Sequence, residues 1–120
     1  MLRQRSTLSL VALGLAATTA WAAPPVGASQ DAAQIAAGQQ VYGAQKCALC
    51  HSIAGKGNKK NPLDGVGAKV SAEDLRKWIT HPDEMTAQTK STKKPPMPKK
   101  YDKLPPADLD ALVAYLQSLK

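Results

Sequence analysis

The sequence contains no phenylalanine, and its only aromatic residues are two tryptophans and three tyrosines. Aromatic side chains normally supply much of the apolar area that a core buries. A small domain buries only a modest fraction of its surface and often relies on a disulfide, a metal or a cofactor for stability. The scarcity of aromatic residues therefore favours a core that is completed by a large apolar ligand.

Cysteine is scarce as well, because Cys47 and Cys50 are the only two in the chain. Two cysteines exclude a disulfide-rich scaffold, which needs several pairs. The two residues are followed directly by His51, which gives the pattern C-x-x-C-H. This pattern is typical of covalent attachment of a c-type haem.

The spacing of this motif suits that chemistry. In a helical turn, residues three and four apart share one face, so Cys47, Cys50 and His51 point the same way. Each sulfur can then add to one haem vinyl group, while the imidazole reaches the iron as the proximal ligand. The motif predicts one covalently bound haem c, with its iron held by His51.

Three other kinds of site use similar residues. A structural disulfide suits an exported chain, but it gives no reason for His51. A thioredoxin-like redox pair would need a βαβ context, which the sequence does not show. A tetrahedral zinc site would need four ligands, and only His81 remains to supplement the motif.

Long hydrophobic runs are missing except near the N-terminus, where Leu8 to Ala20 is almost wholly apolar. Arg3 and Arg5 precede this run without any acidic residue, and small residues follow it up to Ala22. This order is typical of a signal peptide. The run of about a dozen residues is shorter than the roughly 20 that an uncleaved membrane anchor requires.

We therefore expect residues 1–22 to be a cleaved signal peptide, with a second possible cleavage site after Ala28. Residues 23–30 would form a flexible mature N-terminus and residues 31–120 the folded domain. The protein would be exported to the periplasm without a transmembrane span.

Acidic residues are few, at 9 against 16 lysines and arginines. Removal of the signal peptide takes away Arg3 and Arg5 and leaves a mature chain that is still basic. Such a balance affects association with charged surfaces rather than the fold. Because the protein is expected to be exported, we predict acidic surfaces of partner proteins, and not nucleic acid, as its targets.

The first helical pattern follows Asp31, which we predict to be its N-terminal cap. Ile35, Gly38, Val41 and Tyr42 then recur at helical spacing. A glycine on the apolar face of a helix costs about 1 kcal/mol relative to alanine. Its presence at position 38 suggests that another backbone approaches closely there.

A second helix is predicted after Ser71, whose side chain can cap it. Leu75, Trp78 and Ile79 form its apolar stripe, and Pro82 is expected to end it. A third helix is predicted over Leu104 to Leu119. Residues 53–67 and 83–103 contain many Gly, Pro and Lys, so both are expected to be loops.

At this point the chain, from about Ala33 to Leu119, resembles the class I cytochrome c family. Gly38 and Tyr42 match the glycine and aromatic residue of the family's first helix, which crosses the last helix at positions matching Leu112 and Tyr115. The resemblance implies an all-α fold, namely a small class I cytochrome c-like helical domain wrapped around one covalently attached haem.

The resemblance also implies the surroundings of the haem. The segment Asn61-Pro62-Leu63 looks like the family segment in which the proline carbonyl accepts the Nδ1 proton of the haem histidine, so Pro62 would orient His51. Leu63 and Trp78 would contact the cofactor. Met97, which lies among three prolines, matches the position of the distal iron ligand.

Other distal arrangements remain open. Met85 is a rival thioether, but it lacks the proline-flanked setting of Met97. His81 could in principle make a bis-histidine iron, although a histidine before a proline at a helix end is more often a cap or a surface residue. Met97 could also be a packing residue beside an empty distal position.

An iron with both axial positions filled has no open position for a substrate, which favours an electron carrier over an enzyme. The expected function is therefore that of a monomeric periplasmic one-electron carrier. The alternative is a haem relay subunit inside a larger oxidoreductase complex. A gas sensor or peroxidase is less favoured, because either needs an open or displaceable distal position.

Overall fold

The computed structural model describes residues 26–120, with side chains from Asp31 onward, so the predicted signal peptide lies outside the described residues. Most of this part of the chain is helical, in agreement with the predicted all-α fold. The elements in chain order are α1 (Val26–Ala44), η1 (Cys47–Leu49), β1 (Ser52–Ile53), β2 (Lys56–Gly57), α2 (Val66–Lys69), α3 (Ala72–Thr80), α4 (Pro82–Thr89), η2 (Tyr101–Lys103) and α5 (Pro106–Ser118). None of the helices within residues 26–120 has the length and apolar character needed to cross a membrane.

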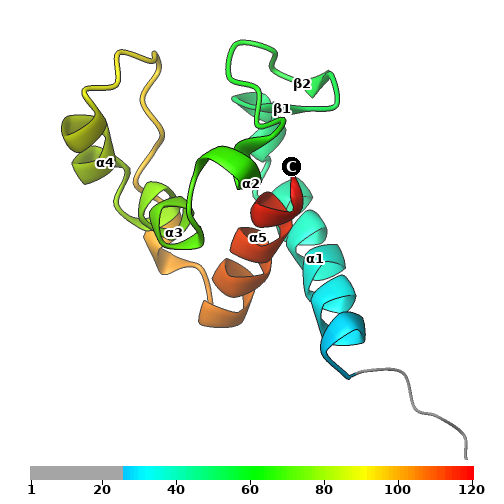
Figure 1. Ribbon diagram of the computed structural model, residues 1–120. Helices are drawn as coiled ribbons and strands as arrows, with labels where there is room; N and C mark the ends of the chain where they lie inside the picture. The colour runs from blue at the N-terminus through cyan, green and yellow to red at the C-terminus, as the bar shows by residue number, and fades with distance from the viewer. Residues whose placement is uncertain (1–25) are drawn as a thin grey trace, which may run out of the picture.

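The first and last helices cross each other closely (Figure 1). A Cβ atom added to Gly38 in α1 would lie 1.9 Å from the carbonyl oxygen of Ala111 in α5. The rings of Tyr42 and Tyr115 meet edge to face beside this crossing, with centroids 5.8 Å apart. The predicted close approach at Gly38 is therefore confirmed. The prediction that Asp31 caps α1 is wrong, because α1 begins at Val26 and Asp31 lies inside it.

A small hairpin follows the cysteine motif, where the sequence predicted only a loop. Strands β1 and β2 pair antiparallel, and Ala54 and Gly55 between them have φ values of 49° and 75°. Positive φ at both central residues is typical of the type I′ turn, which joins short antiparallel strands. The Asp64 carboxylate also accepts a hydrogen bond from the Ala54 amide at 2.8 Å. This bond holds the hairpin turn against the segment that follows the hairpin.

The short helix α2 begins inside the predicted loop of residues 53–67, and it packs on the end of α5. The Gly67 amide donates to the Leu119 carbonyl at 2.8 Å, and the Gln117 side chain donates to the Val70 carbonyl at 2.6 Å. A Cβ atom on Gly67 would lie 2.1 Å from the Gln117 carbonyl oxygen. A glycine is therefore required where the two backbones touch.

Helix α3 begins as predicted, because the Ser71 hydroxyl accepts a hydrogen bond from the Asp74 amide at 3.1 Å. It ends at Thr80, and Pro82 then takes the first position of α4. Proline is well suited to that position because its missing N–H would have no partner in the helix. The prediction of a loop from Asp83 is thus wrong up to Thr89, and Met85 is buried within α4.

The last helix starts two residues later than predicted, at Pro106, and has no side-chain cap. It is joined to α3 by an ion pair between Asp110 and Arg76. The buried core lies between these two helices and η2. Its members are Leu75, Ile79, Tyr101, Leu112, Val113 and Leu116.

Candidate haem site

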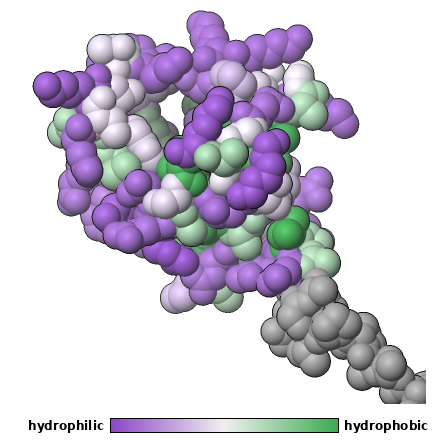
Figure 2. Space-filling view, in the orientation of Figure 1, coloured by the Kyte–Doolittle hydropathy of each residue, from purple (hydrophilic) through white to green (hydrophobic). Residues whose placement is uncertain are grey.

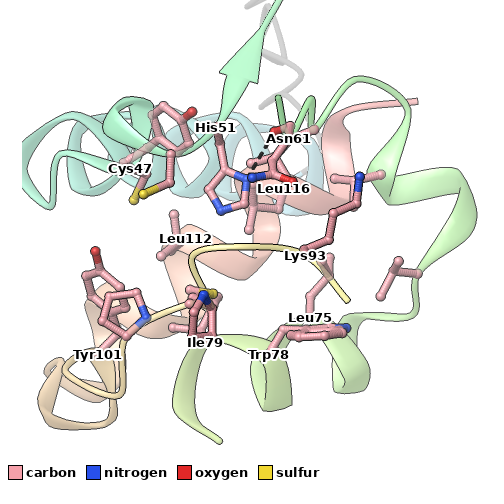
Figure 3. A pocket seen from close by; sticks show the side chains of 18 of the residues that line it. Cys47, His51, Asn61, Leu75, Trp78, Ile79, Lys93, Tyr101, Leu112 and Leu116 are labelled. Carbon is pink, nitrogen blue, oxygen red and sulfur yellow. Dashed lines mark hydrogen bonds between the residues drawn. The ribbon is translucent and has the colours of Figure 1, made fainter. Parts of the chain in front are cut away.

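A cavity of about 300 Å³ opens between the cysteine motif and helix α3 (Figure 3). Its walls are largely apolar and come from α3, α5 and the segment that contains Met97. Figure 3 shows His51 on one side and Trp78 and Ile79 on the facing side. The apolar lining residues include Leu63, Val66, Val70, Leu75, Trp78, Ile79, Leu112 and Leu116.

The three residues of the motif all line this cavity. The chain leaves α1 through Lys46, whose left-handed conformation turns it into η1. The amides of Cys50 and His51 both donate to the Cys47 carbonyl, at 3.1 and 3.0 Å. This tight turn brings both sulfurs and the imidazole to one wall, and the two thiols are not bonded to each other.

The ring of His51 is held by the backbone of the segment after the hairpin. Its Nδ1 atom lies 3.1 Å from the carbonyl oxygen of Asn61 (Figure 3). A carbonyl can only accept, so Nδ1 carries the proton and donates it. The lone pair of Nε2 is then free to bind a metal.

The predicted acceptor was the Pro62 carbonyl, and this prediction is wrong by one residue. Ser52 forms a parallel bridge with Pro62, in which the Ser52 amide donates to Asn61 and the Leu63 amide donates to the Ser52 carbonyl. The C=O and N–H of a trans peptide point in opposite directions, so the Pro62 carbonyl is directed away from Ser52. Pro62 also does not line the cavity.

Burial shifts the pKa of both His51 and Cys47. Burial lowers the pKa of His51, although its hydrogen bond to Asn61 opposes the shift. The imidazole is therefore neutral at neutral pH, as metal ligation requires. Burial raises the pKa of the Cys47 thiol, so this group is a protonated thiol at neutral pH.

The structure separates the three candidates for a distal ligand. Met97 is half-buried, lines the cavity and packs against the core. Met85 is buried in α4 and is not among the lining residues, and His81 is exposed and bonded to Thr80 through Nδ1. Of these three, only Met97 is placed where it can face a ligand in the cavity.

The segment that contains Met97 contacts α4 near both of its ends. At its start, Lys90 has a left-handed conformation and the Ser91 amide donates to the Thr86 carbonyl of α4 at 3.0 Å. At its end, the Lys99 ammonium lies 3.9 Å from the Asp83 carboxylate. The backbone hydrogen bond therefore holds the start of the segment to α4, whereas the exposed ion pair adds little at its end.

Tyr42 also lines the cavity and carries a polar group. Its hydroxyl is buried and has no hydrogen-bond partner among the described residues. Burial, with smaller contributions from Cys47, Tyr115 and Asp64, raises its pKa from 10.0 to about 12. The sequence indicated only that Tyr42 contacts the last helix, and it did not predict that Tyr42 lines the cavity.

We expect a Tyr42→Phe variant to be as stable as the parent at neutral pH, since no hydrogen bond is lost. The raised pKa means that the unfolded chain ionises first, so Tyr42 loses its contribution to stability as pH rises from 10.0 to about 12. The variant should therefore lose less stability over that interval. Thermal unfolding of both proteins across it tests this, with Tyr115→Phe as control; equal alkaline losses in all three would contradict it.

Other lining residues could be found from the sequence only in part. Leu75, Ile79, Leu112 and Leu116 lie on predicted apolar faces, but their exposure to a shared cavity depends on how α3 and α5 pack. Within residues 31–120, no group of three or more His, Cys, Asp or Glu side chains is arranged to hold a metal ion. The four protein ligands that a zinc site needs are therefore not assembled there.

The cavity fits a c-type haem in its chemistry. One wall offers two thiols and a neutral imidazole with a free Nε2. A thioether lies among the lining residues, and the remaining walls are mostly apolar. Cys47, Cys50 and His51 would hold such a group, with Met97 as the second candidate iron ligand.

Comparison with known proteins agrees with this geometry. The family model for cytochrome c matches residues 35–120, which is most of the chain. Neither the curated proteins nor the solved structures contain a match. The matched region contains the cysteine motif, the cavity and all helices after α1, and on this evidence the chain belongs to the cytochrome c family.

Proposed function

We propose that this protein is an exported one-electron carrier with a single haem c, bound to Cys47 and Cys50 and ligated by His51 and Met97. Membership of the cytochrome c family supports haem-based electron transfer. The haem supplies a one-electron ferric/ferrous couple when it is bound. The observation that carries the proposal is the placement of two thiols, a neutral imidazole and a thioether around one apolar cavity.

Each residue has a defined part in this proposal. Cys47 and Cys50 would hold the haem covalently, each through a thioether formed by addition of its S–H across one vinyl group. Asn61 fixes the imidazole of His51 and raises its basicity through the Nδ1 hydrogen bond. Met97 provides a soft thioether, which favours ferrous iron.

The proposed distal ligand is tested by the visible spectrum of the oxidised protein. Met97→Ala is expected to abolish the weak red absorption band that the family resemblance implies for a thioether on ferric haem. Met85→Ala is the matched control, because this thioether is buried outside the cavity lining and its loss affects only stability. If the band survives in the Met97 variant, or disappears in the Met85 variant, the assignment of Met97 is contradicted.

Exposed lysines suggest how the carrier meets its partners. Lys56, Lys59 and Lys60 lie in and after the hairpin, and Lys94, Lys99 and Lys100 lie on the segment around Met97. Figure 2 shows mainly hydrophilic side chains over this face of the molecule. We propose that these lysines bind acidic surfaces of redox partners.

Attraction of this kind weakens with salt, because mobile ions screen exposed charges beyond about 10 Å at 0.1 M ionic strength. The rate of electron transfer with an acidic redox partner should therefore fall steeply as ionic strength rises. Lys59→Glu combined with Lys60→Glu should lower the rate at low salt and reduce its salt dependence. An electron-transfer rate that does not change with ionic strength would indicate that the lysines only keep the surface hydrated.

A haem subunit within a larger complex remains the alternative function. Such a subunit would need an extended apolar patch for permanent docking. In residues 31–120, Leu49 is the large hydrophobic side chain that stands out as exposed, at 71%. One exposed leucine favours the free carrier, and size-exclusion chromatography of the native extract distinguishes the two.

A further inference from the structure

The cavity is lined by charged side chains of one sign only. Lys46 and Lys93 line it, and no aspartate or glutamate does. The other titratable lining residues are Tyr42, Cys47, Cys50, His51 and Tyr101. An apolar cavity with cationic groups at its edge is complementary to a ligand that is mostly apolar but has negative charge at its periphery.

The two lysines lie at different sides of the cavity. Lys46 directly precedes Cys47 and so belongs to the side at which the thiols lie. Figure 3 shows Lys93 on the other side of His51 from Cys47. Thr86 in α4 and Ser91 just after this helix each carry a hydroxyl group. Both residues are half-buried and also line the cavity.

Lys93 is attached to a fixed part of the fold. The backbone bond from Ser91 to Thr86 holds the segment against α4, and the Lys93 amide lies 3.4 Å from the Ser91 hydroxyl. Among the ion pairs of residues 31–120, the cationic members are Arg76, Lys77 and Lys99. The ammonium of Lys93 is thus available to a ligand in the cavity.

Haem has two propionate groups, on the half of the macrocycle opposite its two vinyl groups. If Cys47 and Cys50 hold the vinyl side, the propionates point toward the side at which Lys93 lies. We propose that the Lys93 ammonium binds a haem propionate carboxylate, beside the hydroxyl groups of Ser91 and Thr86. A hydrogen bond between ionised groups is about twice as strong as one between neutral groups.

This inference rests on the proposed attachment of haem, and it adds a function to the segment of Met97. Lys93 lies four residues before Met97 on the same anchored segment. Binding of a propionate would hold this segment against the cofactor, so Lys93 acts as a positioning residue. Its positive charge would also favour the ferrous state, which has one positive charge fewer than the ferric state.

The test compares three variants of the haem-loaded protein: Lys93→Gln, Lys93→Arg and Lys94→Gln. Lys94 is the matched control, because it is exposed like its neighbour Lys93 but does not line the cavity. The midpoint potential is measured by spectroelectrochemistry, and the carboxylate bands by redox-difference infrared spectroscopy. Both readouts report on the haem and not on its partners.

Lys93→Gln should shift the equilibrium with a one-electron mediator several-fold toward the oxidised protein and should move a carboxylate band. Lys93→Arg should retain most of the parent behaviour, and Lys94→Gln should change little. If Lys93→Gln and Lys94→Gln give the same potential and the same carboxylate bands, Lys93 does not bind a propionate. Absence of covalent haem from all four proteins would instead refute the proposed function, and the role of Lys93 with it.

Discussion

A Gly38→Ala variant is expected to lose at least about 3 kcal/mol of folding free energy, or not to fold at all. The added Cβ would lie 1.9 Å from the Ala111 carbonyl oxygen and 2.6 Å from the Tyr115 Cβ. Both neighbours belong to α5, so neither can rotate away as a flexible side chain could. The two helices would have to separate, and this would open the core around Leu112 and Leu116.

Gly43→Ala is the matched control on the same helix. A Cβ atom at Gly43 meets nothing within 4 Å, and alanine is favoured over glycine in a helix by about 0.5–1 kcal/mol. This variant should be unchanged or slightly more stable. Guanidinium unfolding of the two variants, followed by helical circular dichroism, measures the difference; equal stability would contradict the close crossing of α1 and α5.

The second large effect is expected from removal of the haem attachment. A Cys47→Ala, Cys50→Ala variant without haem should be largely unfolded. The walls of the cavity include Leu75, Ile79 and Leu112, which belong to the same small core. Burial of several hundred Å² of porphyrin at about 25 cal/mol per Å² contributes on the order of 10 kcal/mol to folding. Without the haem, the small core does not bury enough additional apolar area to replace this stabilisation.

Leu49→Ala is a useful control for this variant, because Leu49 lies between the two cysteines and its side chain is 71% exposed. It alters the same turn but keeps the C-x-x-C-H pattern, so it should retain haem and native helical content. Circular dichroism with thermal melting distinguishes the variants. Native helicity and a cooperative melt in the haem-free double variant would show that the chain folds without the cofactor.

Features that depend on neighbouring residues were predicted well from the sequence. The Ser71 cap is confirmed, and Met97 lines the same cavity as the cysteine motif. Each of these predictions depends on a few adjacent residues with specific chemistry, whereas the binding of haem by these residues stays a prediction. Gly38 was also interpreted correctly, because a glycine on an apolar helix face has few explanations other than a close contact. The family resemblance placed the crossing at Leu112 and Tyr115, and the structure places it at Ala111 and Tyr115.

Features that depend on the path of the backbone were missed. The acceptor of the His51 proton is set by the parallel bridge between Ser52 and Pro62, which decides which peptide carbonyl points at the ring. Helix α4 was missed because its sequence is polar and its one deeply buried thioether, Met85, shows no period. The polar lining residues Thr86, Ser91 and Lys93 lie in α4 or directly after it, so their place in the cavity wall depends on the position of this helix.

The central claim is that Cys47 and Cys50 hold one haem, and peptide mass spectrometry of the exported protein tests it most directly. The protein is produced in cells that attach c-type haem, and the fragment containing residues 47–51 is isolated. We predict that this fragment contains one haem and that neither cysteine reacts with a thiol reagent. A haem-free fragment with two reactive thiols, or with a disulfide between them, would contradict the account.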